Sequence, residues 1–110
     1  MLPANLYIPQ GVSEVIDQLS MMMLKSPTFV DRTGYFPWQN VDTVFHQLNE
    51  GLRLVRGKLG EERYNKLVDM SDRMRVYFEA DPADRTDDTR KGCKLILDMQ
   101  ELLKQKIKRS

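Results

Sequence analysis

The sequence predicts an all-α fold, an antiparallel bundle of about four helices. Apolar residues recur at three-and-four spacing in four segments, which is typical of amphipathic helices. No alternating run of β-branched residues bounded by turn pairs predicts a strand. The connections between the four segments are short, which favours antiparallel neighbours. At 110 residues and 41% apolar content, the chain fits a single domain over 1–110, with an extended lead-in over 1–11.

The first helix is predicted between Ser13 and Lys25. The hydroxyl of Ser13 is suited to accept a hydrogen bond from a free backbone N–H one turn further on. Pro27 cannot continue a helix and biases Ser26 away from helical angles, so the helix is expected to end near Lys25. Its apolar face consists of Val12, Val15, Ile16, Leu19, Met22 and Met23.

The second helix is predicted as one continuous element over 41–59. Either Asn40 or Asp42 can cap its start, and Gly60 is well placed to cap its end. Gly51 and Gly57 lie off the apolar stripe, where each weakens the helix by about 1 kcal/mol relative to alanine. Such glycines are tolerated where packing stabilises the helix or where another group approaches the backbone closely. The stripe consists of Val41, Val44, Phe45, Leu48, Leu52, Val55 and Leu59.

Two further helices complete the predicted bundle. Glu61 and Glu62 open the third, where negative charge suits the positive end of the helix dipole. The pair Asp81–Pro82 ends it. The fourth helix is predicted to begin after Thr86 and to run to the C-terminus. Cations near its end complement the dipole: Lys104, Lys106, Lys108 and Arg109.

Charge and cysteine content exclude several classes of protein. Lys and Arg number 17 and Asp and Glu 16, a balance that argues against a dedicated duplex-binding protein. Cys93 is the single cysteine, so a disulfide scaffold is excluded. The longest apolar stretch, 21–24, is far too short for a membrane span, and the N-terminus lacks the pattern of a signal peptide. These features predict a soluble, cytoplasmic protein with no membrane partner.

No motif in the sequence points to catalysis, a metal or a cofactor. His46 and Cys93 are the single residues of their types, and nothing in their spacing supports a nucleophile with its base. A zinc site needs three or more ligands, which these two residues do not supply. The sequence therefore predicts a protein that is not an enzyme and that has no cofactor and no metal.

The connector between the first two helices is rich in aromatic residues. Four of the nine aromatic residues of the chain are Phe29, Tyr35, Phe36 and Trp38, beside Gly34 and Pro37. Large aromatics on a connector either close a core from outside or anchor a recognition surface. Both interpretations remain open. In the second, Tyr35, Phe36 and Trp38 are the apolar contact residues for a partner.

An acidic segment, 79–88, is the second candidate contact site. It contains Asp81, Asp84, Asp87 and Asp88, but its spacing does not match a calcium-binding loop. Acidic residues at a helix start are stabilising, so a solvated turn with helix capping explains the segment. The alternative is an acidic patch that orients a basic partner.

The chain resembles the small all-helical immunity proteins of bacteria, which neutralise contact-dependent or secretion-delivered toxins. The resemblance lies within 34–103, in the segments 34–37 (GYFP), 58–64 (KLGEERY) and 78–82 (FEADP). It implies tight one-to-one binding of a cognate toxin domain that blocks the toxin's active site. The balanced charge differs from that of the strongly acidic immunity proteins that pair with basic nucleases.

The sequence therefore predicts a non-enzymatic binding protein whose partner is a protein. The alternative is a small helical nucleic-acid-associated or regulatory protein that uses its basic residues: Arg53, Arg56, Arg73, Arg75 and the basic C-terminus. Salt dependence separates the two, because counterion release makes nucleic-acid binding fall steeply with salt. A homodimer is a further alternative, since an exposed aromatic patch can pair with its own copy.

Overall fold

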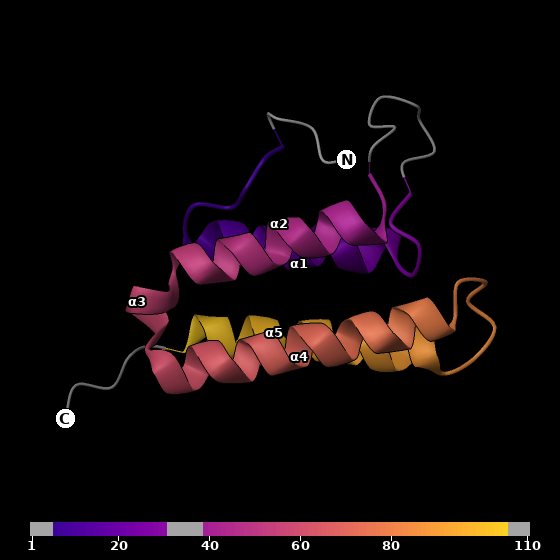
Figure 1. Cartoon of the computed structure of the whole chain (residues 1–110). Coiled ribbons are helices and arrows are strands. Elements are labelled where there is room, and N and C mark those ends of the chain that lie inside the picture. Colours follow the sequence, from indigo (N-terminus) through magenta and orange to yellow (C-terminus); the bar gives the residue numbers. More distant parts are fainter. Residues whose placement is uncertain (1–5, 31–38, 106–110) are drawn as a thin grey trace.

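The computed structural model describes residues 6–30 and 39–105 and places five helices in them (Figure 1). The helices are α1 (Val12–Lys25), α2 (Val41–Leu54), α3 (Arg56–Leu59), α4 (Glu61–Ala80) and α5 (Asp88–Lys104). No residue within the described ranges is in a strand. The predicted all-α fold is therefore confirmed.

The four long helices form two antiparallel hairpins that stack on each other. Figure 1 shows α1 and α2 as one layer and α4 and α5 as the other. Contacts of α2 with α4 and of α1 with α5 join the layers. This arrangement agrees with the predicted helical bundle. It also brings the end of α1, the start of α2 and the loop between α4 and α5 to the same end of the bundle (Figure 1).

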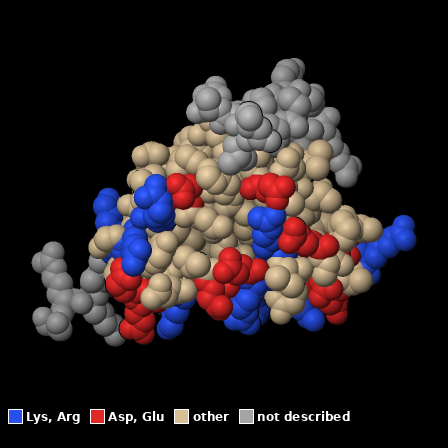
Figure 2. Space-filling model, viewed as in Figure 1, with Lys and Arg blue, Asp and Glu red and all other residues tan. Residues whose placement is uncertain are grey.

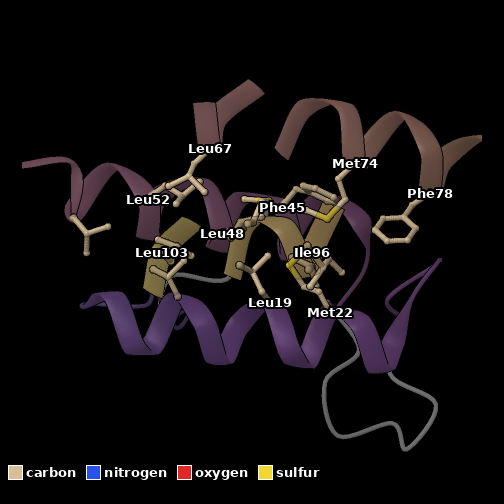
Figure 3. Packing of buried hydrophobic residues seen from close by; sticks show 14 of the residues in the cluster. Leu19, Met22, Phe45, Leu48, Leu52, Leu67, Met74, Phe78, Ile96 and Leu103 are labelled. Atoms are coloured by element: carbon tan, nitrogen blue, oxygen red, sulfur yellow. The ribbon is translucent and has the colours of Figure 1, made fainter. Parts of the chain in front are cut away.

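The apolar stripes of the four long helices meet in one core. Figure 3 shows Leu19 and Met22 of α1 packed with side chains of α2, α4 and α5. Phe45, Met74 and Ile96 are each at most 1% exposed. Burial of such side chains is the main favourable contribution to the stability of a helical bundle of this size.

The prediction of one helix over 41–59 is wrong at its C-terminal end. Helix α2 ends at Leu54, and Val55 has φ −98° and ψ 7°, so the last turn becomes the separate helix α3. Val55 and Leu59 are nevertheless buried, at 1% and 6% exposure. The break keeps both side chains in the core while the chain turns toward α4. Gly60 then ends α3 with φ 84°, which confirms the predicted cap, since glycine adopts positive φ without a steric penalty.

Asn40 is the residue that caps α2. Its side-chain oxygen accepts a hydrogen bond of 3.1 Å from the backbone N–H of Thr43. The Asn40 N–H in turn donates to the Thr43 hydroxyl at 2.9 Å, which completes a reciprocal capping box. Asp42, the other candidate, pairs with Arg75 of α4 instead.

The predicted cap of α1 by Ser13 is wrong. Helix α1 begins at Val12, and its cap position is Gly11, two residues before Ser13, with no capping side chain. The carboxylate of Glu14, in the first turn of α1, accepts from the N–H of Gln10, which precedes the helix, at 3.2 Å. The same carboxylate accepts from the Tyr7 hydroxyl at 2.6 Å and so ties the lead-in to α1.

Of the two glycines in the predicted second helix, Gly51 is the one that allows a close approach. A Cβ on Gly51 would lie 3.1 Å from Cβ of Pro9 and 3.2 Å from Cγ2 of Val15. The missing side chain therefore lets both the lead-in and α1 pack against α2. Around Gly57, by contrast, a Cβ would meet no atom within 4 Å.

Candidate functional site

The predicted aromatic contact residues Tyr35, Phe36 and Trp38 lie outside the described residues. Their role therefore stays a prediction. The described residues on either side of this segment, Val30 and Gln39, are close in sequence to the end of α1 and the start of α2. These helix ends lie at the same end of the bundle as the acidic loop (Figure 1).

Phe29, the first aromatic of the run, closes the core. It is fully buried, and its ring contacts Phe45 and Phe78 edge-on, with centroid distances of 5.8 and 5.2 Å. Its backbone has φ 61°, which is rare for a bulky side chain. The backbone of Phe29 thus adopts a left-handed conformation, found in neither helices nor strands, that places its ring in the core.

Asp81 is buried and braces the loop between α4 and α5. One carboxylate oxygen accepts from the N–H of Arg85 at 2.8 Å. The other accepts from the hydroxyl of Thr89 at 2.7 Å and from the Thr89 N–H at 3.3 Å. The N–H of Thr86 reaches both oxygens at 3.2 Å. Asp81, 3% exposed, therefore has its carboxylate occupied within the chain, whereas the sequence placed it among the partner contacts.

The hydrogen bonds to Asp81 change its titration. Burial alone would raise the pKa of this carboxyl. The hydrogen bonds from the Thr89 side chain and from the backbone N–H groups of Arg85, Thr86 and Thr89 outweigh burial and lower the pKa to about 2. The carboxylate is thus held ionised while the loop is folded.

Replacing Asp81 with asparagine is expected to lower the melting temperature at pH 7 by about 5 °C or more, because the loop and the start of α5 lose charged acceptors. A carboxyl with a lowered pKa stabilises the fold fully above its unfolded pKa of about 4, and this contribution is lost as the pH falls through about 2. The difference in melting temperature between the unchanged chain and the Asp81→Asn variant should therefore become smaller as the pH falls from 4 to 2. Melting curves by circular dichroism at several pH values measure it. Asp87→Asn, at an exposed position in the same loop, is the control, and an equal effect there would contradict the assignment.

The other three aspartates of the segment differ in exposure. Asp84 and Asp87 are exposed, and Asp84 has φ 54°, a left-handed conformation that aspartate tolerates better than most residues. Asp88 is half-buried at the first position of α5, where its carboxylate accepts from the Thr86 hydroxyl at 3.2 Å and lies 4.0 Å from the Lys91 ammonium. The exposed carboxylates of the loop are thus those of Asp84 and Asp87.

An ion pair that the sequence did not predict joins α2 and α4. The guanidinium of Arg75 on α4 pairs with Asp42 of α2 and with Glu79, the latter at 3.4 Å. The same group lies 5.7 Å from the centroid of the Phe45 ring. Helical spacing predicts the pair of Arg75 with Glu79, because the two residues are four apart. It does not predict the pair of Arg75 with Asp42 of α2, which depends on how the hairpins stack.

The four arginines named for nucleic-acid binding are paired with carboxylates, whereas the basic residues of the C-terminus beyond 105 lie outside the described residues. Arg53 lies 3.0 Å from Glu50, Arg56 lies 2.6 Å from Glu61 and Arg73 lies 3.5 Å from Asp69. Figure 2 shows Lys and Arg interspersed with Asp and Glu on the face that it presents, without a basic stripe. Mixed charge of this kind is typical of a solvated helix surface.

His46 and Cys93 are placed in different surroundings. His46 is exposed on α2. Cys93 is half-buried on α5, with its sulfur 3.4 Å from the hydroxyl oxygen of Ser26. Among residues 6–30 and 39–105, no three side chains of His, Cys, Asp or Glu come together in a way that could hold a metal ion. No helix in these ranges is both long and apolar enough to cross a membrane.

Comparison of the chain with models of protein families, with curated proteins and with solved structures finds no match.

Proposed function

We propose that the chain is a non-enzymatic binding protein that neutralises a bacterial toxin domain by binding it and covering its active site. The observation that supports the proposal most is the loop between α4 and α5, which is braced from within and presents two exposed carboxylates. Asp84 and Asp87 would orient the basic surface of the partner. Tyr35, Phe36 and Trp38 remain the predicted apolar anchors.

The internal bracing of the loop favours binding. A loop that is already ordered loses little conformational entropy when a partner docks on it. In this loop, the carboxylate of Asp81 holds the backbone of Arg85, Thr86 and Thr89 by hydrogen bonds. In the proposal, Asp81 is therefore a positioning residue rather than a contact.

The ion pairs of the arginines favour a protein partner over a nucleic acid. Arg53, Arg56, Arg73 and Arg75 each lie within 4.0 Å of a carboxylate. A phosphate backbone would have to compete with those carboxylates for each guanidinium. The acidic loop would in addition repel it.

The test combines a rescue assay with a binding measurement. The toxin domain that the proposal predicts to be encoded beside this chain is expressed in bacterial cells with and without the chain, and the purified proteins are mixed at several salt concentrations. The expected results are restored growth and a one-to-one complex that weakens only modestly with salt. Absence of both a complex and rescue would contradict the proposal. Retention of RNA or DNA that is lost steeply with salt would instead support the nucleic-acid alternative.

Replacing Asp84 and Asp87 together with asparagine is expected to slow association with the toxin domain about tenfold at low salt, because steering charges act mainly on the association rate. Asparagine keeps the shape of both side chains and tolerates the positive φ at position 84. The control, Glu62→Gln with Asp72→Asn, removes the same charge from exposed positions on α4. Equal slowing in both double variants would show that only net charge matters.

A further inference from the structure

Helices α1 and α5 lie side by side in opposite directions, and hydrogen bonds fix their register. The side-chain amide of Gln100 donates to the Ile16 carbonyl at 3.0 Å and to the Ser20 hydroxyl at 2.8 Å. Further along, the Ser26 hydroxyl lies 3.4 Å from the sulfur of Cys93. Residues 20–26 of the first hairpin therefore lie beside residues 93–100 of α5.

Two large apolar side chains are exposed at the middle of this pair. Leu24 is 86% exposed and Leu97 is 56% exposed. Leu24 lies one turn after Ser20, and Leu97 lies one turn before Gln100, so the register places the two leucines at the same level of the adjacent helices. The half-buried Met23 adds apolar surface beside them.

Charged residues flank this apolar centre in a definite order. Toward the start of α5, Arg90 and Lys94 are exposed on the same helical stripe as Leu97. In the other direction, Asp17 of α1 and Glu101 of α5 are exposed. The face therefore has a cationic end, an apolar centre and an anionic end.

Asp98 lies near the cationic end of this face and Lys104 near its anionic end, but neither reverses the order of the charges. Lys94 lies 3.5 Å from Asp98, but its side chain remains 76% exposed. Lys104 is exposed one turn beyond Glu101, at the last position of α5.

We infer that the outer face of α1 and α5 binds a second copy of this chain about a two-fold axis. A two-fold axis that lies in the interface, passes through the apolar centre and runs perpendicular to the helices places the cationic end of each copy against the anionic end of the other. It also brings Leu24 and Leu97 of both copies together, where they leave water. An apolar centre with a charged rim is the usual anatomy of an interface, and the order of the charges makes this face complementary to itself. The inference is independent of the proposed function.

The first test is sedimentation of the full chain over a series of concentrations. We expect a reversible dimer with a dissociation constant in the micromolar range, roughly that of a modest interface. Leu24→Glu combined with Leu97→Glu should leave only monomer. Val76→Glu, at a residue of α4 that is 66% exposed, is the matched control and should leave the dimer unchanged.

The second test uses the order of the charges. Asp17→Lys with Glu101→Lys makes both ends cationic, and Arg90→Glu with Lys94→Glu makes both ends anionic. Each double variant alone should dissociate at least about tenfold more readily, since like charges then face each other. An equimolar mixture of the two should form a heterodimer that weakens with salt. A wild-type chain that stays monomeric at the highest concentrations, or a mixture that associates no better than its components, would overturn the inference.

Discussion

Replacing Gly92 with alanine is expected to lower the free energy of unfolding by about 1–3 kcal/mol, the usual effect of overpacking a core. A Cβ at this position would lie 2.6 Å from Cε1 and 2.7 Å from Cζ of Phe78. The ring is 1% exposed and packs edge-on against Phe29, so it cannot move aside freely. Alanine normally stabilises a helix interior by about 1 kcal/mol relative to glycine, so the expected sign is opposite to that of helix propensity. Urea unfolding followed by far-ultraviolet circular dichroism measures the effect.

Gly57→Ala is the matched control for this prediction. Gly57 is also in a helix, but a Cβ there would meet no atom within 4 Å. Its replacement is expected to leave stability unchanged or to raise it by up to about 1 kcal/mol, because alanine restricts the unfolded chain. If the two variants proved equally stable, the close contact of α5 with Phe78 would be refuted.

Replacing Phe29 with alanine is expected to lower the free energy of unfolding by about 3–5 kcal/mol, the range for removing a buried phenylalanine side chain. The variant loses two edge-on ring contacts, with Phe45 and Phe78. Such a loss is a large fraction of the 5–15 kcal/mol that is typical for a domain. The midpoint of urea unfolding should therefore fall strongly.

Two further variants separate the effect of losing the Phe29 ring from effects of the backbone conformation and of the position in the chain. Val30→Ala, at the neighbouring residue that is 51% exposed, should change stability by no more than about 0.5 kcal/mol. Phe29→Gly should be no less stable than Phe29→Ala, since glycine readily adopts the φ of 61° found there. A small effect of Phe29→Ala would mean that this aromatic does not close the core.

Local signals in the sequence predicted most of the architecture. Apolar spacing places Leu19, Phe45 and Ile96 on the inner faces of their helices, and all three are buried. Asn40, one of the two predicted candidates, caps the start of α2, and Gly60 ends α3 as predicted, because a capping side chain and a glycine at positive φ act within a few residues of the chain. Such signals do not depend on how the helices pack.

The misjudged end of the second helix depends on packing between distant segments. The apolar stripe continues through Val55 to Leu59, so the apolar spacing does not mark the break that directs the last turn toward α4, although Gly57 weakens the helix there. Periodicity reports which residues are apolar on one face, but not whether one straight helix can bury all of them.

Of the candidate site, the sequence determined that an acidic loop follows the third long segment and that aromatic residues cluster on the first connector. Only the tertiary structure decided that Asp81 turns inward while Asp84 and Asp87 face water, and that Phe29 lies in the core. The physical reason is the same in both cases. A carboxylate is stable when buried only if several donors converge on it, and a ring is buried only where other side chains surround it. The donors to Asp81 come from residues four to eight positions further along the chain, which the turn into α5 folds back onto the carboxylate. The rings around Phe29 come from the distant helices α2 and α4.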